Sequence, residues 1–411
     1  MSKIDKKEIP ESVLKMKKIM KSYYFKAKFA KLFRRKIAWI TSGGPVEPLI
    51  AMGIIPVYPE NHGAMIGAAK MGNELCQKAD EMGYSSDLCS YARADIVCSY
   101  TGGGPIGGLP SPDMLICCNN ICGTVLKWYE IQARRYRVPL FIFDTPFVHT
   151  NYTEEARYYL ENQVSEYIDF LEKVTGRKAS MKKMQKVGSL SVEAMKLWQK
   201  ILNTAVNRPS PMTAFDAFFY LALIVTLRGT KVVVDFYKFL LEELTEKVED
   251  NIGAIPDERY RLLWDNLPIW YKMRWLSNKF KEHNASLVAD TYTTAWCDTL
   301  EFIDENNFIQ TLGDAYSQIY LNIGVDKMAD KIIRMIDKYQ IDGVVMHSNR
   351  SCKPYSFGQL DIQKIIYEKR RIPTLLIEAD MTDGRKFSDE LVGSRIDFFM
   401  EVLKERKRIL L

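Results

Sequence analysis

Long apolar runs are missing from this chain of 411 residues. No stretch reaches the ~18 consecutive apolar residues that a membrane-spanning helix needs, so no membrane span is expected. The N-terminus carries no apolar core followed by a small-residue cleavage site, so no secretory signal is expected and a cytoplasmic protein is predicted. Histidine is also scarce, because only four are present and none forms an H-x-x-x-H or H-E-x-x-H pair. A histidine-rich metal site is therefore not expected.

A nucleotide-binding P-loop is missing as well. The glycine-rich run at 102–108 lacks the Lys-Ser/Thr pair of a P-loop and the G-x-G-x-x-G spacing of a dinucleotide site. We interpret this run as a flexible turn, and no ATP site is expected.

Acidic residues are few in one region only, the N-terminal arm formed by residues 1–36. This arm holds 13 Lys and Arg against 3 Asp and Glu, whereas the rest of the chain holds 44 against 48. The net charge of +6 therefore describes the arm and not the body, which does not have the charge of a nucleic-acid-binding protein. Apolar residues recur at near-helical spacing over 10–35, which predicts a basic amphipathic helix. We interpret it as a segment that packs on the body or on a partner, and binding to a membrane surface is the alternative.

Strand and helix patterns alternate in the first and last parts of the chain, as is typical of parallel βαβ units. The strand candidates are residues 37–41, 54–58, 114–118, 139–143, 286–289, 343–347 and 373–378. The predicted fold class is therefore α/β, with two Rossmann-like (flavodoxin-like) parallel-sheet domains and a helical segment between them. The predicted divisions are a basic helical arm over 1–36, a first α/β domain over 37–150, a helical segment over 151–285 and a second α/β domain over 286–411.

Polar residues of the types that carry out catalysis or bind metals lie just after predicted strands. Ser42 follows the first strand and Glu60 the second, while Asn119–Cys122 and Ser348–Cys352 follow two later strands. Ligands of open α/β sheets bind at these strand ends, so a cleft between the two domains is the expected site. Ser42 does not lie in a G-x-S-x-G nucleophile elbow. The position of Glu60 after a proline is equally consistent with an acid–base role and with a plain turn.

The chain has eight cysteines, and disulfides are not expected in a cytosolic protein. Cys122 opens a predicted helix, Cys89 lies near a helix start and Cys352 follows a strand. Three such thiols can hold one iron–sulfur cluster and leave one iron without a protein ligand. Their spacing matches no local ferredoxin pattern, so inert packing cysteines remain the alternative. Cys117 and Cys118 are predicted to pack within a strand.

Several runs resemble the 2-hydroxyacyl-CoA dehydratase and benzoyl-CoA reductase superfamily over nearly the whole chain beyond the arm. They are YPEN at 58–61, SSDLCSYAR at 85–93, LICCNNICGTVLKWYE at 115–130, NRPSPM at 207–212 and HSNRSC at 347–352. The CCNNIC…KWYE run with YPEN upstream is the most specific part. The chain resembles most the α-type subunit of an (R)-2-hydroxyacyl-CoA dehydratase.

The resemblance implies a lyase that removes water from an acyl-CoA thioester by a ketyl radical mechanism. It implies a [4Fe–4S] cluster on Cys89, Cys122 and Cys352, with Ser42 and Glu60 as active-site residues. It also implies two partners, a related second dehydratase subunit and a separate ATP-hydrolysing iron–sulfur activator that delivers one electron. The separate activator is consistent with the missing P-loop.

Three alternatives remain open at this point. Gly43 and Gly44 stand where the dehydratases carry bulkier residues, and SFGQL at 356–360 is similar to the reductases. The reductases, however, lack both the serine at position 42 and the Asn-Asn-Ile before the second cysteine, so a dehydratase is preferred over a benzoyl-CoA reductase subunit. A homodimeric double-cubane reductase, which needs about six cysteines near one site, and a non-enzymatic electron carrier are the other two.

Overall fold

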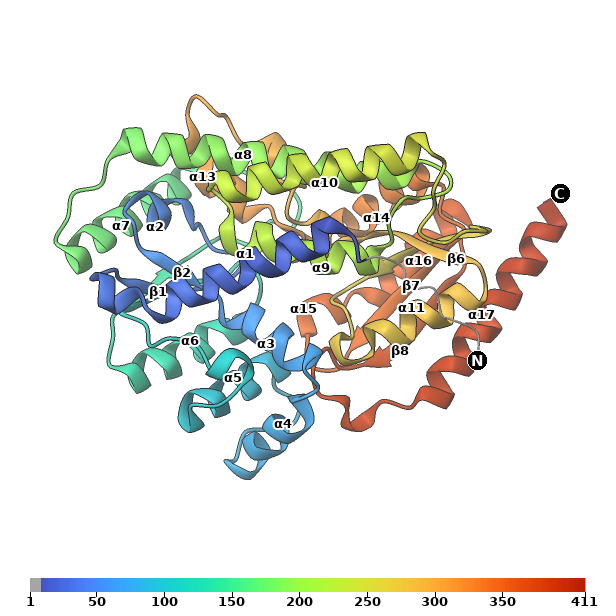
Figure 1. Cartoon of the computed structure of the whole chain (residues 1–411), viewed down its shortest axis with the longest axis horizontal. Helices are drawn as coiled ribbons and strands as arrows, with labels where there is room; N and C mark the ends of the chain where they lie inside the picture. Colours follow the sequence, from blue (N-terminus) through green and yellow to red (C-terminus); the bar gives the residue numbers. More distant parts are fainter. Residues whose placement is uncertain (1–8, 411) are drawn as a thin grey trace.

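The computed structural model describes residues 9–410 and contains two four-stranded parallel sheets, which lie side by side in Figure 1. The first sheet has the strand order β2-β1-β3-β4 and every pair in it is parallel. Its strands are β1 (Ile37–Ile40), β2 (Ile55–Val57), β3 (Met114–Cys118) and β4 (Leu140–Phe143). The runs IAWI and MLICC are buried at every position, as expected for central strands that are covered on both faces.

The second sheet repeats the same arrangement, with the order β6-β5-β7-β8 and parallel pairing throughout. Its strands are β5 (Tyr260–Asp265), β6 (Ala285–Asp290), β7 (Gly343–Asn349) and β8 (Thr374–Ala379). Each order is that of a flavodoxin-like sheet with four strands, so the predicted fold class is confirmed.

The strand β5 corrects the predicted organisation, because it lies inside the segment 151–285 that we expected to be helical. Its sequence YRLLWD contains no β-branched residue, and two of its six residues are charged, so it does not look like a buried strand. Both charged residues are nevertheless buried. Arg261 donates to the carbonyl oxygen of Tyr339 at 2.7 Å and pairs with Glu258 at 2.5 Å, which satisfies its guanidinium. Asp265 accepts hydrogen bonds from Thr291 and Gln359.

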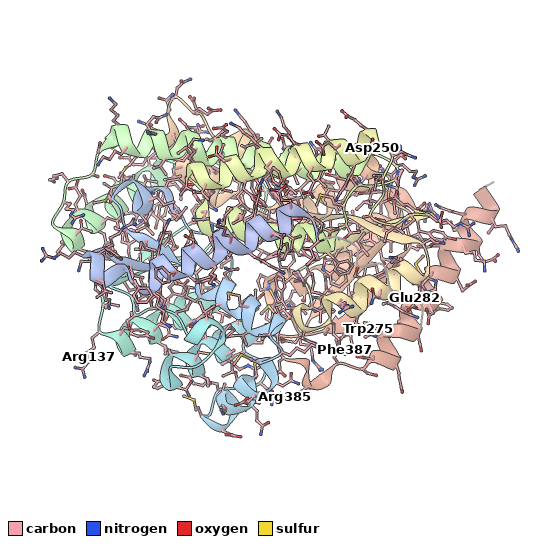
Figure 2. The ribbon with its side chains drawn as sticks, viewed as in Figure 1. Arg137, Asp250, Trp275, Glu282, Arg385 and Phe387 are labelled. Atoms are coloured by element: carbon pink, nitrogen blue, oxygen red, sulfur yellow. The ribbon has the colours of Figure 1, made fainter. Side chains whose placement is uncertain are left out.

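Helices cover both sheets, and a helical layer joins them (Figure 1). The first α/β unit contains α2 (Glu47–Ala51), α3 (Pro59–Ala68), α4 (Gly72–Glu81), α5 (Ser90–Thr101) and α6 (Gly123–Tyr136). The layer contains α7 (Glu154–Thr175), α8 (Met181–Asn203), α9 (Ala214–Leu227) and α10 (Lys231–Glu249). The second unit contains α11 (Met273–Glu282), α12 (Thr291–Thr294), α14 (Val325–Tyr339), α15 (Lys353–Ser356), α16 (Gln359–Arg370) and α17 (Asp389–Leu410). The helix α13 (Phe308–Ser317) packs on α7 and α8 of the layer. Trp275 of α11 packs edge to face on Phe387 at a ring-centroid distance of 5.9 Å, just before α17 begins (Figure 2).

The predicted N-terminal helix is present as α1 (Glu11–Lys28) and crosses the front of the molecule in Figure 1. It packs on α9 and α10 of the helical layer through Met16 and its neighbours, which supports the interpretation of an arm that packs on the body. Ser12 fixes its beginning, because its hydroxyl group lies 2.9 Å from a carboxylate oxygen of Glu243 in α10. Residues 1–8 of the predicted arm lie outside the described residues. No helix within 9–410 is both long enough and apolar enough to span a membrane.

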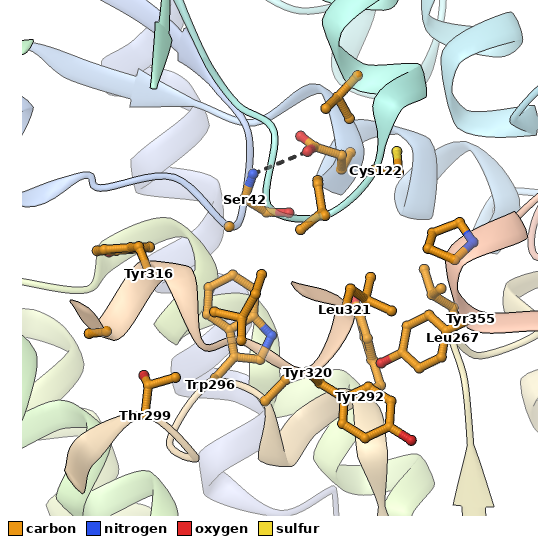
Figure 3. A pocket seen from close by; sticks show the side chains of 18 of the residues that line it. Ser42, Cys122, Leu267, Tyr292, Trp296, Thr299, Tyr316, Tyr320, Leu321 and Tyr355 are labelled. Atoms are coloured by element: carbon orange, nitrogen blue, oxygen red, sulfur yellow. Dashed lines mark hydrogen bonds between the residues drawn. The ribbon is translucent and has the colours of Figure 1, made fainter. Parts of the chain in front are cut away.

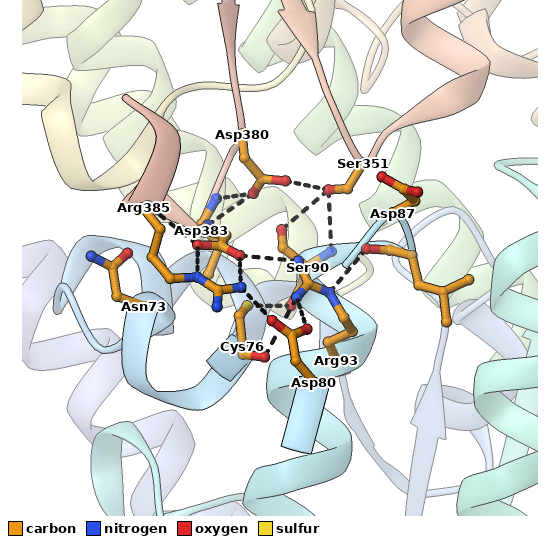
Figure 4. A network of polar contacts seen from close by, with 12 residues as sticks. Asn73, Cys76, Asp80, Asp87, Ser90, Arg93, Ser351, Asp380, Asp383 and Arg385 are labelled. Atoms are coloured by element: carbon orange, nitrogen blue, oxygen red, sulfur yellow. Dashed lines mark hydrogen bonds and ion pairs between the residues drawn. The ribbon is translucent and has the colours of Figure 1, made fainter. Parts of the chain in front are cut away.

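An ion-pair network centred on the buried Arg93 connects the two α/β units (Figure 4). Arg93 of α5 is 1% exposed and pairs with Asp80 at 2.8 Å and, across the junction, with Asp383 at 3.2 Å. Arg385 extends the network to Asp80 at 2.9 Å. Because removing one partner leaves a buried charge uncompensated, this network favours a single arrangement of the two units.

A second set of hydrogen bonds crosses the same junction. The backbone N–H of Ser90 donates to the hydroxyl oxygen of Ser351 at 3.2 Å, and that hydroxyl group donates to Asp380 at 2.5 Å. Ser90 and Ser351 are the chain neighbours of Cys89 and Cys352. The junction therefore holds two of the cysteines singled out in the sequence close to each other.

Candidate active site

A cavity of about 180 Å³ lies where the carboxyl ends of the two sheets face each other. Residues that follow strands of both sheets line it, among them Ser42 after β1, Cys122 after β3 and Tyr292 after β6 (Figure 3). Cys352, after β7, lines it as well. The strand order reverses between β1 and β3 in the first sheet and between β5 and β7 in the second. Open α/β sheets bind their ligands at such switch points, and here two of them meet.

All three predicted cluster cysteines line this cavity, and each is the N-cap residue of a helix. Cys89 precedes α5, Cys122 precedes α6 and Cys352 precedes α15. Backbone N–H groups of the first turns, such as those of Ala92 and Val125, hydrogen-bond the sulfur atoms. Three helix starts therefore direct their partial positive charge toward one region.

Burial dominates the titration of these thiols. It raises the pKa of Cys89 to about 12 and raises those of Cys122 and Cys352 as well. Charge repulsion from Cys122 also raises the pKa of Cys89, and repulsion from Cys89 and Cys122 raises that of Cys352. Without a cation nearby the thiols are protonated, whereas coordination to a metal deprotonates a thiol outright.

The cavity offers three thiols, which is the donor type that iron–sulfur clusters use. Within residues 9–410, no group of three or more His, Cys, Asp or Glu side chains converges on a point as the ligands of one ion would. The N–H groups of three helix starts are also suited to the negative charge of such a cluster.

Ser42 and Glu60 lie together in the wall of the same cavity. The backbone N–H of Ser42 donates to Glu60 Oε1 at 3.2 Å, and the hydroxyl group of Tyr129 donates to Oε2 at 3.2 Å. Glu60 belongs to the first turn of α3, after β2. Burial raises its pKa to about 7, although both hydrogen bonds lower it. A carboxyl group with this pKa can both hold and release a proton near neutral pH.

A second polar cluster in the cavity wall was missed by the sequence analysis. Arg228, at the end of α9, forms an ion pair with Glu47 of α2 at 3.2 Å. The hydroxyl groups of Tyr316 and Ser191 donate to the same carboxylate at 3.0 and 2.8 Å. Glu47 and Arg228 are 2% and 3% exposed. The only signal in the sequence was an arginine that directly follows the apolar helix 214–227.

The remaining cysteines lie elsewhere in the fold. Cys117 and Cys118 are buried in β3, as predicted, and Cys76 is buried in α4. In the described part of the chain, none of the five cysteines other than Cys89, Cys122 and Cys352 lines the cavity. The glycine-rich run 102–108 forms a loop after α5 and does not line it either.

Two flavodoxin-like units that enclose a ligand cavity at their switch points define the chain as a double-domain α/β protein with a thiol-containing site. Comparison with known proteins gives its family. A family model described as 2-hydroxyglutaryl-CoA dehydratase, D-component, matches residues 41–403, so the chain belongs to this family. Dehydratases are hydro-lyases, so the predicted enzyme class is confirmed at the level of the family.

Individual relatives refine this assignment. The chain is similar to the (R)-2-hydroxyisocaproyl-CoA dehydratase alpha subunit of Clostridioides difficile, with 34% identity over 398 residues, 95% of this chain and 96% of the relative. It is similar to the (R)-phenyllactyl-CoA dehydratase alpha subunit of Clostridium sporogenes, with 31% identity over 374 residues, 90% of each chain. A benzoyl-CoA reductase subunit of Thauera aromatica is more distant, with 27% identity over 411 residues, 96% of this chain and 95% of the relative. The predicted resemblance to dehydratase α-type subunits is confirmed.

Proposed function

We propose that this chain is the iron–sulfur α-type subunit of a 2-hydroxyacyl-CoA dehydratase, which converts an (R)-2-hydroxyacyl-CoA into the (E)-2-enoyl-CoA. One observation carries the proposal: Cys89, Cys122 and Cys352 meet at three helix starts in a cavity that also contains Ser42 and Glu60. The names of the relatives as dehydratase alpha subunits support it.

The three cysteines would hold a [4Fe–4S] cluster with one iron free of protein ligands. When bound, the cluster would supply one electron and a Lewis-acidic iron for the thioester carbonyl group, which is the chemistry of the ketyl radical mechanism that the resemblance implies. This chemistry is needed because the β-proton of an ordinary acyl thioester is hardly acidic.

Ser42 and Glu60 act on the substrate in this proposal. The Ser42 hydroxyl group donates a hydrogen bond to the departing 2-hydroxyl group. Glu60 exchanges a proton with the substrate through a carboxylate oxygen, and its pKa of about 7 makes both protonation states accessible. The largely apolar wall of the cavity limits the access of water to the reacting atoms.

Two partners complete the proposed system. A related second subunit is implied by the alpha-subunit names of the relatives. A separate iron–sulfur activator, which hydrolyses ATP in the cytoplasm, delivers the electron, and the absence of a P-loop from this sequence supports that division of labour. A double-cubane site is not proposed, because only three cysteines of the described residues line the cavity.

The experiment is an anaerobic assay of the complex purified with its partner subunit, in the presence of activator and ATP, on a panel of 2-hydroxyacyl-CoAs. We expect the wild-type complex to form 2-enoyl-CoA from at least one of these substrates. The Cys352→Ala complex should form none. Reduction of benzoyl-CoA without any dehydration would favour the reductase alternative. Purification as a homodimer that dehydrates none of the panel would exclude the dehydratase.

A further inference from the structure

The cavity contains one cation, and that cation is already neutralised. Among the described residues that line it, Arg228 is the only Lys or Arg. Its Nε lies 3.2 Å from Glu47 Oε1, and both side chains are almost completely buried. The ion pair therefore contributes no net charge to the cavity wall. Glu60 is the only other Asp, Glu, Lys, Arg or His among the described lining residues.

The remaining hydrogen-bond donors of Arg228 are occupied as well. Its Nη2 donates to the hydroxyl group of Tyr316 at 2.7 Å and to the carbonyl oxygen of Gly44 at 3.3 Å, and its Nη1 donates to the carbonyl oxygen of Ile224 at 3.4 Å. Four of the five guanidinium N–H groups thus have partners within the chain. A carboxylate is bound tightly by two parallel N–H groups, and Arg228 has no such pair to offer.

Aromatic rings cover the faces of this guanidinium. Its central carbon lies 5.3 Å from the ring centre of Trp296 and 5.6 Å from that of Tyr316. With both rings close to it and Glu47 as its ion-pair partner, Arg228 is part of the wall and not a free binding group.

The region around this ion pair lies away from the cysteines. In Figure 3 Tyr316 and Thr299 lie at one side of the cavity and Tyr355 at the other, with Ser42 between them. The wall near the pair is apolar and comes from α8 and α13 and the segment before α13. It includes Met195, Ile303, Phe308, Leu312 and Ala315.

We propose that this end of the cavity receives the side chain of the acyl group, and that it selects an uncharged, apolar side chain over one that ends in a carboxylate. Glu47 is the specificity-determining residue, because its carboxylate cancels the charge of Arg228, which would otherwise attract a substrate carboxylate. The inference rests on the proposed function and extends it from the reaction to the substrate class.

The test uses two unreactive thioesters that share coenzyme A and are similar in size, 4-methylpentanoyl-CoA and glutaryl-CoA. Their binding to the anaerobically purified complex is measured by calorimetry for the wild type, Glu47→Gln and a control, Glu258→Gln. Glu258 is a buried carboxylate that pairs with Arg261 outside the cavity, so its variant undergoes the same chemical change elsewhere.

In the wild type we expect 4-methylpentanoyl-CoA to bind at least about 100-fold more tightly than glutaryl-CoA, since a carboxylate would be buried without a counterion. In Glu47→Gln, Arg228 becomes an uncompensated cation, and we expect the preference to shrink by about 10-fold or more through tighter binding of glutaryl-CoA. Glu258→Gln should keep the wild-type preference.

Equal binding of the two thioesters to the wild type overturns the inference whatever the variants do, and leaves the proposed function intact. An unchanged preference in a folded Glu47→Gln complex overturns the role of Glu47. If the complex binds neither thioester, the proposed function fails together with the inference.

Discussion

At the scale of single residues, the three cavity cysteines share a position that their sequence spacing does not reveal. Cys89, Cys122 and Cys352 are each the residue before a helix. We expect Ala at any one of them to remove most of the iron and acid-labile sulfide of anaerobically prepared protein, because a cluster with two protein ligands is poorly held. Iron and sulfide analysis measures this. Cys118→Ala, which removes a buried thiol outside the cavity, should retain the cluster, and retention in all three Ala variants would contradict the assignment.

Glu60 and Ser42 allow a separate test, because the proposal gives them roles in catalysis and not in cluster binding. We expect Glu60→Gln to lower the rate by about 100-fold or more, since it keeps the shape and removes the base. Ser42→Ala should slow hydroxide departure, and both variants should keep their iron. The measurement is anaerobic turnover together with iron content.

Glu74→Gln, on the exposed face of α4, is the matched control for Glu60→Gln. If both site variants turn over like the wild type and only melt earlier, Ser42 and Glu60 are turn residues. Such residues contribute roughly 1 kcal/mol to stability.

The candidate site could be predicted where chemistry and strand ends coincide. Ser42, Glu60, Cys89, Cys122 and Cys352 each follow a strand or lie at a helix start, and the resemblance to the dehydratases pointed to the same residues. Arg228 could not be predicted, because its role depends on Glu47, which lies 181 positions away in the sequence and reaches it only through the packing of α2 against the helical layer.

At the scale of elements, the strand β5 shows why the pattern of apolar residues misleads in a buried strand. Arg261 and Asp265 interrupt its apolar run, and only partners from other segments make their burial tolerable. The strands β1, β3 and β7 carry no such charges within their apolar cores, and they were predicted correctly.

Asp290, at the end of β6, provides a prediction about pH. It caps α12 by accepting a hydrogen bond from the backbone N–H of Thr293 at 2.5 Å, and burial raises its pKa to about 7. Because the pKa of Asp290 is higher in the folded chain than in the unfolded chain, the folded state binds the extra proton. Its contribution to stability is therefore complete below about pH 4 and is lost as the pH rises through about 7.

We expect Asp290→Asn to remove this dependence while it keeps the cap. Between pH 5 and 8, the wild type should lose up to about 3 kcal/mol of unfolding free energy relative to Asp290→Asn. Thermal melts at several pH values measure this. A difference that stays constant with pH would show that Asp290 does not change its protonation state in this range.

At the scale of the whole molecule, the junction between the two α/β units positions the site. Ser351 accepts a hydrogen bond from Ser90 and donates one to Asp380, and these serines adjoin Cys89 and Cys352. We expect Ser351→Ala to assemble the cluster with an unchanged absorption spectrum but to lose iron to a chelator several-fold faster, because the two cysteines then separate more easily. Ser348→Ala, near the end of the preceding strand β7, is the control. Equal rates of iron loss in Ser351→Ala and the wild type would show that the junction does not control access to the cluster.

The identical strand order of the two sheets has a consequence for the descent of this protein. Cys122 follows β3 and Cys352 follows β7, and these strands occupy equivalent positions in their sheets. We infer that an ancestral half with one such cysteine was duplicated and fused. A symmetrical pair of halves supplies ligands in even numbers, whereas Cys89 occurs in the first half alone and brings the count to three. In the proposed site this odd number of ligands leaves one corner of a four-cornered cofactor open to the substrate.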